Sequence, residues 1–177
     1  MTEKYAIVAF PVFDAADVVE SVRRRFDPLA SILPAHITLV FPFVDAATEA
    51  DLAIHITSAI ANQRAFDITF RDVSVEDGGY LFLNVESGGA VLREIHDRLY
   101  SSRLESHLSS SHVYEPHITV GRLADPERLT FAANEAKTAL AAVLRGRIRE
   151  VTLFRLDEGG GGEVALTFGL LQDQAHT

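Results

Sequence analysis

Hydrophobic and polar positions along the chain fall into two kinds of segment, and their order predicts an α+β fold. Apolar runs and alternation with a period of two indicate strands, whereas apolar residues with a period near 3.6 indicate amphipathic helices. The first half of the chain shows strand, helix, strand, helix and then a two-stranded hairpin. The expected ranges, in that order, are 5–12, 14–26, 36–43, 48–62, and 66–76 with 80–86.

The second half repeats much of this order. We expect a helix at 90–103, a polar loop at 105–115, a strand at 116–123, a helix at 125–144 and a hairpin of 145–157 with 164–171. The repetition predicts two pseudo-symmetric lobes, each an antiparallel sheet with helices on its outer face, around a central cleft. Because no low-complexity linker separates the halves, residues 1–177 are expected to form a single bilobal domain.

Capping and turn residues support several of these boundaries. Thr48 and Asp51 have the spacing of a helix capping box. Pro126 follows Asp125 at a position typical of a first helical turn. Asp77-Gly78-Gly79 is a strong hairpin-turn signal, and the four glycines at 159–162 are expected to connect the second hairpin.

One tetrapeptide pattern occurs twice, once in each half, on two of the expected strands. The copies are His36-Ile37-Thr38-Leu39 and His117-Ile118-Thr119-Val120, and each closely follows a proline. Side chains in a strand alternate between faces, so the histidine and threonine of each copy share one face while the aliphatic residues point to the other. Two such strands side by side would offer two imidazoles and two hydroxyls to one surface, as acid/base chemistry on a phosphate ester requires.

A third match to the pattern serves as an internal comparison. His55-Ile56-Thr57-Ser58 lies in the middle of an expected helix and has no flanking proline. In a helix, residues i and i+2 point in very different directions, so His55 and Thr57 cannot act together on one substrate. We therefore assign His55 to a helix surface.

Composition limits the class of protein and the compartment. The chain has 177 residues, of which 47% are hydrophobic and 23% charged, as is typical of a soluble globular protein. Its longest apolar runs have the length of strands, so no membrane span is expected. The first residues lack the features of a signal peptide, and no cysteine occurs, so the expected location is the cytoplasm.

The net charge narrows the range of partners. A formal charge of −9 opposes binding of long nucleic acid, because neutralising many phosphates requires a basic protein. A substrate that carries phosphate is therefore expected to be a small nucleotide or one RNA terminus, held by a few local donors. The expected assembly is a monomer.

The paired tetrads, their spacing and their preceding prolines resemble the 2H phosphoesterase superfamily, which includes bacterial 2′-5′ RNA ligase-like proteins and cyclic nucleotide phosphodiesterases. The resemblance implies a bilobal fold with the tetrads facing each other, chemistry on 2′,3′-cyclic or 2′-5′ phosphoesters, and no required metal or other cofactor. It also implies that His36 and His117 are the catalytic histidines and that Thr38 and Thr119 bind phosphate. Gly121-Arg122 matches the small and basic residues that continue the second tetrad in many relatives.

Three further side chains are candidates for the rim of the cleft. Arg122 is a phosphate-binding candidate, but strict alternation would put it on the face opposite His117 unless a bulge occurs at Gly121. Tyr114 and Phe43 are candidates for stacking on a base. A metal site is not expected, because each tetrad contributes one histidine and a threonine, which is a poor ligand.

The expected reaction needs one neutral and one protonated imidazole. The neutral ring activates water, the protonated ring donates to the departing ribose oxygen, and the two hydroxyls donate to the non-bridging oxygens. The alternatives are a non-catalytic module that binds a nucleotide or RNA end, and an RNA 2′-5′ ligase. A different phosphoester, such as ADP-ribose 1″,2″-cyclic phosphate or an acyl-phosphopantetheine-like ligand, is a third reading.

Overall fold

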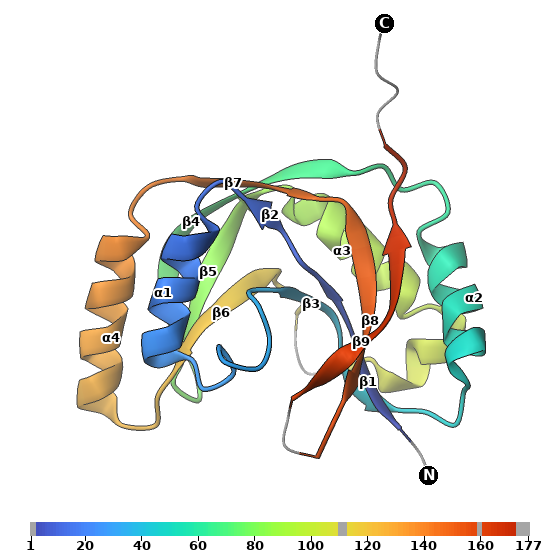
Figure 1. Ribbon diagram of the computed structural model, residues 1–177, viewed down its shortest axis with the longest axis horizontal. Helices are drawn as coiled ribbons and strands as arrows, with labels where there is room; N and C mark the ends of the chain where they lie inside the picture. The colour runs from blue at the N-terminus through green and yellow to red at the C-terminus, as the bar shows by residue number, and fades with distance from the viewer. Residues whose placement is uncertain (1–2, 110–112, 159–160, 173–177) are drawn as a thin grey trace, which may run out of the picture.

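The computed structural model describes residues 3–109, 113–158 and 161–172, and these form two antiparallel sheets with helices packed on them (Figure 1). The first sheet, which we call sheet A, has the strand order β3-β1-β8-β9. Its strands are, in that order, Ile37–Val44, Lys4–Ala9, Glu150–Leu156 and Gly162–Gly169. The α+β class and the two lobes predicted from the sequence are confirmed.

The second sheet, sheet B, has the order β2-β7-β4-β5-β6. Its strands are, in that order, Val12–Phe13, Leu144–Ile148, Phe66–Glu76, Tyr80–Ser87 and His117–Arg122. The helices are α1 (Ala16–Phe26), α2 (Glu49–Ala59), α3 (Gly89–Leu99) and α4 (Pro126–Ala139), with a 3₁₀ helix, η1, at Ser102–His107.

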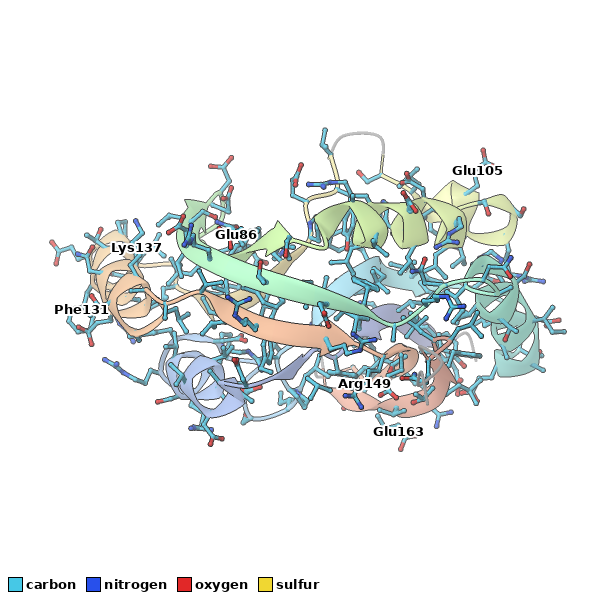
Figure 2. All side chains as sticks on the ribbon, turned by 90° about the horizontal axis from the view of Figure 1, so that it is seen from above. Glu86, Glu105, Phe131, Lys137, Arg149 and Glu163 are labelled. Atoms are coloured by element: carbon cyan, nitrogen blue, oxygen red, sulfur yellow. The ribbon has the colours of Figure 1, made fainter. Side chains whose placement is uncertain are left out.

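The helices form two pairs at opposite ends of the molecule, as both views show (Figures 1 and 2). Helices α1 and α4 pack against β6 and β4 of sheet B, while α2 and α3 pack together and α3 contacts β3 of sheet A. Among the described residues, no helix is long and apolar enough to cross a membrane.

The two lobes are not the two halves of the sequence. Strands β8 and β9, from the end of the chain, complete the sheet that contains the first tetrad, and β4 and β5, from the first half, lie in the sheet of the second tetrad. The expected strand at 145–157 is therefore wrong as one element. It divides at Arg149 into β7 and β8, which belong to different sheets.

The expected strand at 5–12 divides in the same way. It becomes β1 in sheet A and β2 in sheet B, with a break at Phe10 and Pro11. Proline has no N–H to donate to a strand ladder, so a crossing between sheets at Pro11 loses no hydrogen bond there.

Local signals set other boundaries as expected. Thr48 caps α2 through both hydrogen bonds of a capping box with Asp51. Asp125 caps α4 by accepting from the backbone N–H of Arg128 at 2.8 Å. Helix α4 ends at Ala139 rather than near 144, because Leu144 is already part of β7. The expected glycine turn at 159–162 lies partly outside the described residues.

Candidate functional site

The two tetrads lie on strands that contact each other in the middle of the molecule (Figure 1). His36 immediately precedes β3, and His117 is the first residue of β6. The aliphatic tetrad residues are fully buried: Ile37, Leu39, Ile118 and Val120, each 0% exposed. The histidines and threonines between them are half-buried. The predicted alternation is thus confirmed, and the histidine and threonine of each tetrad face away from the helix-covered core.

Both histidines are held in the same way. His36 donates from Nδ1 to the carbonyl of Pro34 at 2.8 Å, and His117 donates from Nδ1 to the carbonyl of Glu115 at 2.7 Å. A carbonyl only accepts, so Nδ1 carries the proton in both rings. In the neutral imidazoles Nε2 is therefore the basic nitrogen, and the two rings are equivalent in tautomer.

The surroundings of both rings favour the neutral form. Burial lowers the pKa of His36 below its ordinary value, and the charges of Arg23 and His117 lower it further. The hydrogen bond to Pro34 and the charge of Asp27 raise this pKa, but the net shift is downward. Burial also lowers the pKa of His117, while its bond to Glu115 and the carboxylate of Glu76 raise it. The charge of His117 lowers the pKa of His36, so the two rings lie close enough to interact.

Aromatic rings support the two imidazoles unequally. Phe82 stacks on His117 with a centroid distance of 3.5 Å and an interplanar angle of 13°. Phe10 meets His36 edge-on at 6.2 Å. Phe82 lies opposite Thr119 in the β5–β6 register, which gives it the same face as the second tetrad. Sequence reasoning missed Phe82, because only the strand register reveals the neighbour of His117.

Arg122 reaches the face of His117 through a bulge. Leu81 pairs with Gly121 but Phe82 pairs with Thr119, so β6 has one extra residue between these partners. After this irregularity Arg122 pairs with Tyr80, and its guanidinium lies 4.8 Å from the centre of the Tyr80 ring. The extra residue is Val120, next to Gly121 where the prediction put the bulge, so Arg122 remains a candidate for phosphate binding.

Tyr114 connects the two tetrads. Its hydroxyl donates to the carbonyl of Thr38 at 2.9 Å, and its ring stacks on His96 at 3.8 Å. His96 in turn donates from Nδ1 to the carbonyl of Leu39 at 2.8 Å, and the hydroxyl of Tyr100 accepts from the N–H of Phe41 at 3.1 Å. We call His96, Tyr100 and Tyr114 the edge clasp, because they bind the outer edge of β3.

The edge clasp limits the expected stacking role of Tyr114. One face of its ring lies against His96, so stacking on a base would use the other face and stays a prediction. Phe43, the other stacking candidate, is 4% exposed and packs against Tyr5, and it is therefore not accessible to a base. Tyr80 and Phe82 lie on β5 beside the second tetrad, and their rings contact each other there.

The remaining titratable groups do not gather into a metal centre. Among the described residues, no group of three or more histidine, cysteine, aspartate or glutamate side chains is arranged to hold a metal ion. His55 lies inside α2, as expected, and donates from Nε2 to the carbonyl of Leu99 at 2.7 Å.

Comparisons with known proteins agree with this arrangement. The chain is 30% identical over 129 residues to a Bacillus pumilus protein named "Putative phosphoesterase", with 70% of this chain and 73% of the relative covered. It is 31% identical over 124 residues to a protein of the same name from Geobacillus thermodenitrificans, with 67% and 69% covered.

Solved structures show the same fold at low sequence identity. Escherichia coli LigT without a ligand superposes with a TM-score of 0.63 at 16% identity, covering 97% of this chain and 99% of LigT. A structure described as a phosphoesterase gives a TM-score of 0.63 at 17% identity, with 96% and 99% covered. The sequence model of the 2′-5′ RNA ligase superfamily matches residues 11–160. The chain therefore belongs to the 2′-5′ RNA ligase superfamily, the 2H phosphoesterases.

Proposed function

We propose that the protein is a phosphoesterase that opens 2′,3′-cyclic phosphates or 2′-5′ phosphodiester bonds of a small nucleotide or an RNA terminus. The observation that carries the proposal is the matched pair of imidazoles. His36 immediately precedes β3 and His117 is the first residue of β6, and these two strands contact each other. Both rings have the same tautomer, which leaves Nε2 of each ring for a substrate. Solved structures of the superfamily member LigT with 3′-AMP, ATP and phosphate support a small nucleotide as ligand.

The chemistry follows from the two rings and their neighbouring hydroxyls. The neutral imidazole accepts a proton at Nε2 from a water that attacks phosphorus. The protonated imidazole donates a proton to the ribose oxygen as its bond to phosphorus breaks. Thr38 and Thr119 donate to the non-bridging oxygens, whose negative charge grows in the transition state, and Arg122 adds positive charge at the rim. The product is a phosphomonoester, and a proton exchange with solvent resets the pair.

The test compares three histidine variants in hydrolysis of 2′,3′-cyclic nucleotides and 2′-5′-linked dinucleotides. We expect His36→Ala and His117→Ala each to lower kcat by about 10²–10⁴-fold, because each removes one proton-transfer group. His55→Ala is the matched control, since it removes the histidine of the helical copy of the motif and should leave kcat unchanged. Full activity in either tetrad variant contradicts the proposal.

The same assay separates the alternatives. Tight binding of nucleotides without any product from either substrate class supports a non-catalytic binding module. Joining of RNA ends through a 2′-5′ linkage supports a ligase. A monomeric assembly and a cytoplasmic location stay predictions from the sequence.

A further inference from the structure

The peptide group between Pro34 and Ala35 is hydrogen-bonded at both ends. Its carbonyl oxygen accepts from Nδ1 of His36 at 2.8 Å, and its N–H donates to Oε1 of Glu20 at 2.6 Å. The two ends belong to one resonance-stabilised plane. A carboxylate bound to the N–H therefore increases the negative charge on the carbonyl oxygen, because bonds in a chain polarise one another.

Glu20 is itself fixed by a buried arginine. Arg23 donates from Nη1 to both carboxylate oxygens of Glu20, at 3.1 and 3.0 Å, and from Nε and Nη2 to Asp27 at 3.0 and 2.8 Å. Arg23 is only 1% exposed. Asp27 also accepts the N–H of Leu29 at 3.0 Å. The cluster thus fastens both ends of the loop that leads from α1 to His36.

The second histidine lacks this arrangement. His117 donates from Nδ1 to the carbonyl of Glu115 in the same geometry, but the next residue is Pro116. Proline has no N–H, so no carboxylate can bind the other end of that peptide group. The two histidines therefore have the same tautomer, but they differ in the peptide group that holds them: the one that holds His36 binds a carboxylate, and the one that holds His117 cannot.

We propose that Glu20 is a positioning residue for His36, acting through the Pro34–Ala35 peptide group. It strengthens the carbonyl as an acceptor for Nδ1–H, which holds the ring orientation and favours the imidazolium form. This is the role that a carboxylate plays by direct contact in a hydrolase triad, here transmitted through one peptide. The importance of Glu20 for turnover rests on the proposed function, but its hold on His36 does not.

The other charges that act on His36 must be separated from this effect. They are Arg23 on α1, Asp27 directly after α1 and His117 on β6, with the ring of Phe10, directly after β1, as an uncharged neighbour. Loss of the Glu20 charge also leaves Arg23 less neutralised, which lowers the pKa of His36 through space. Two NMR signals are therefore needed: the titration of the His36 ring and the chemical shift of its Nδ1 proton.

The main variant is Glu20→Gln, which keeps an amide oxygen as acceptor but removes the charge. We expect the protonation constant of His36 to fall about threefold and its Nδ1 proton to move upfield, with the Nδ1 proton of His117 unchanged. Asp27→Asn exposes the charge of Arg23 without touching the peptide, so it should lower the pKa of His36 and leave the Nδ1 proton in place. Glu20→Asp keeps the charge on a shorter side chain and should give a smaller upfield shift, which preserves the test if Glu20→Gln does not fold.

Glu135→Gln is the matched control, because Glu135 on α4 pairs at 2.9 Å with Arg25, which like Glu20 lies on α1, and both partners of this pair are exposed. It should change neither signal. An unmoved Nδ1 proton of His36 in both Glu20 variants overturns the proposal. The NMR result does not depend on turnover, so a protein that hydrolyses no cyclic phosphate can still pass this test, and an active protein can fail it.

Discussion

The lowered pKa values of His36 and His117 set the pH at which the pair can work. The proposed reaction needs one protonated and one neutral ring. Burial lowers both pKa values, so at neutral pH most free molecules have two neutral rings, and the mixed state becomes more populated as the pH falls. Below both lowered values the two rings are protonated and the base is lost.

We therefore expect a bell-shaped pH profile of kcat/KM for a 2′,3′-cyclic nucleotide, with its maximum below the ordinary histidine value of about 6.5. Initial rates at low substrate concentration across a pH series measure it. His36→Ala and His117→Ala should each lack one limb in whatever residual activity remains. A maximum on the alkaline side of neutrality contradicts this account of the site.

The tetrads could be found from the sequence because period-two alternation alone assigns a face to each residue. Arg122 could not be placed that way, since its face depends on an extra residue in β6 that only the pairing register reveals. Glu20 could not be found from the sequence, because its hydrogen bond to the N–H of Ala35 depends on how the loop after α1 folds back. His96 carried no motif that marked it, yet it is 4% exposed and bound to β3.

At the scale of elements, β3 is an edge strand, and its free backbone groups must be satisfied without another strand. The edge clasp does this with two tyrosine hydroxyls and one imidazole from α3 and the segment before β6. One of these side chains, Tyr114, lies shortly before His117 in the sequence and binds the carbonyl of Thr38 in the first tetrad. Tyr114 thereby links the positions of the two tetrads.

The turn between β4 and β5 offers a test of how β6 is held. A Cβ on Gly79 would lie 2.0 Å from the carbonyl oxygen of Leu123, directly after β6, whereas a Cβ on Gly78 would meet only the Tyr80 ring at 3.3 Å. Both glycines have positive φ, 80° at Gly78 and 78° at Gly79, so alanine is strained at either position.

We expect Gly78→Ala to lower the free energy of unfolding by about 1–2 kcal/mol, the cost of the left-handed conformation. Gly79→Ala should cost more, about 2–4 kcal/mol, because it must also displace Leu123 and the end of β6. Urea unfolding of both variants beside the wild type measures the difference. Equal losses in the two variants contradict a close packing of the turn on β6.

Element boundaries were predictable where capping and turn residues act locally, as at Thr48, Asp77 and Asp125. The break at Arg149 was not, because residues 145–157 carry one continuous strand pattern. Their division follows from tertiary structure: Ile148 is buried in sheet B and Val151 in sheet A. A period-two pattern gives the face of a strand, not the sheet to which it belongs.

For the whole molecule, the exchange of strands between the halves makes the lobes dependent on each other. Sheet A takes β1 and β3 from the first half and β8 and β9 from the second, and sheet B is mixed in the same way. Neither lobe is a continuous segment of chain that could fold by itself. The single domain expected for residues 1–177 follows from this dependence as a prediction.

We accordingly expect both lobes to unfold in one step. The ring protons of His36 and His117, which report on sheets A and B, should lose their native NMR signals at the same urea concentration. His55, on α2, provides a third probe away from the site and should follow the same curve. Separate midpoints for His36 and His117 contradict the prediction and indicate two independent folding units.

The position of β1 has a consequence for synthesis of the protein. Strand β1 lies between β3 and β8, yet β8 and β9 are translated after the other strands that the structure describes. In the nascent chain, one flank of β1 therefore stays open until β8 has left the ribosome. A product truncated before β8 would expose an unpaired, apolar strand suited to recognition by chaperones.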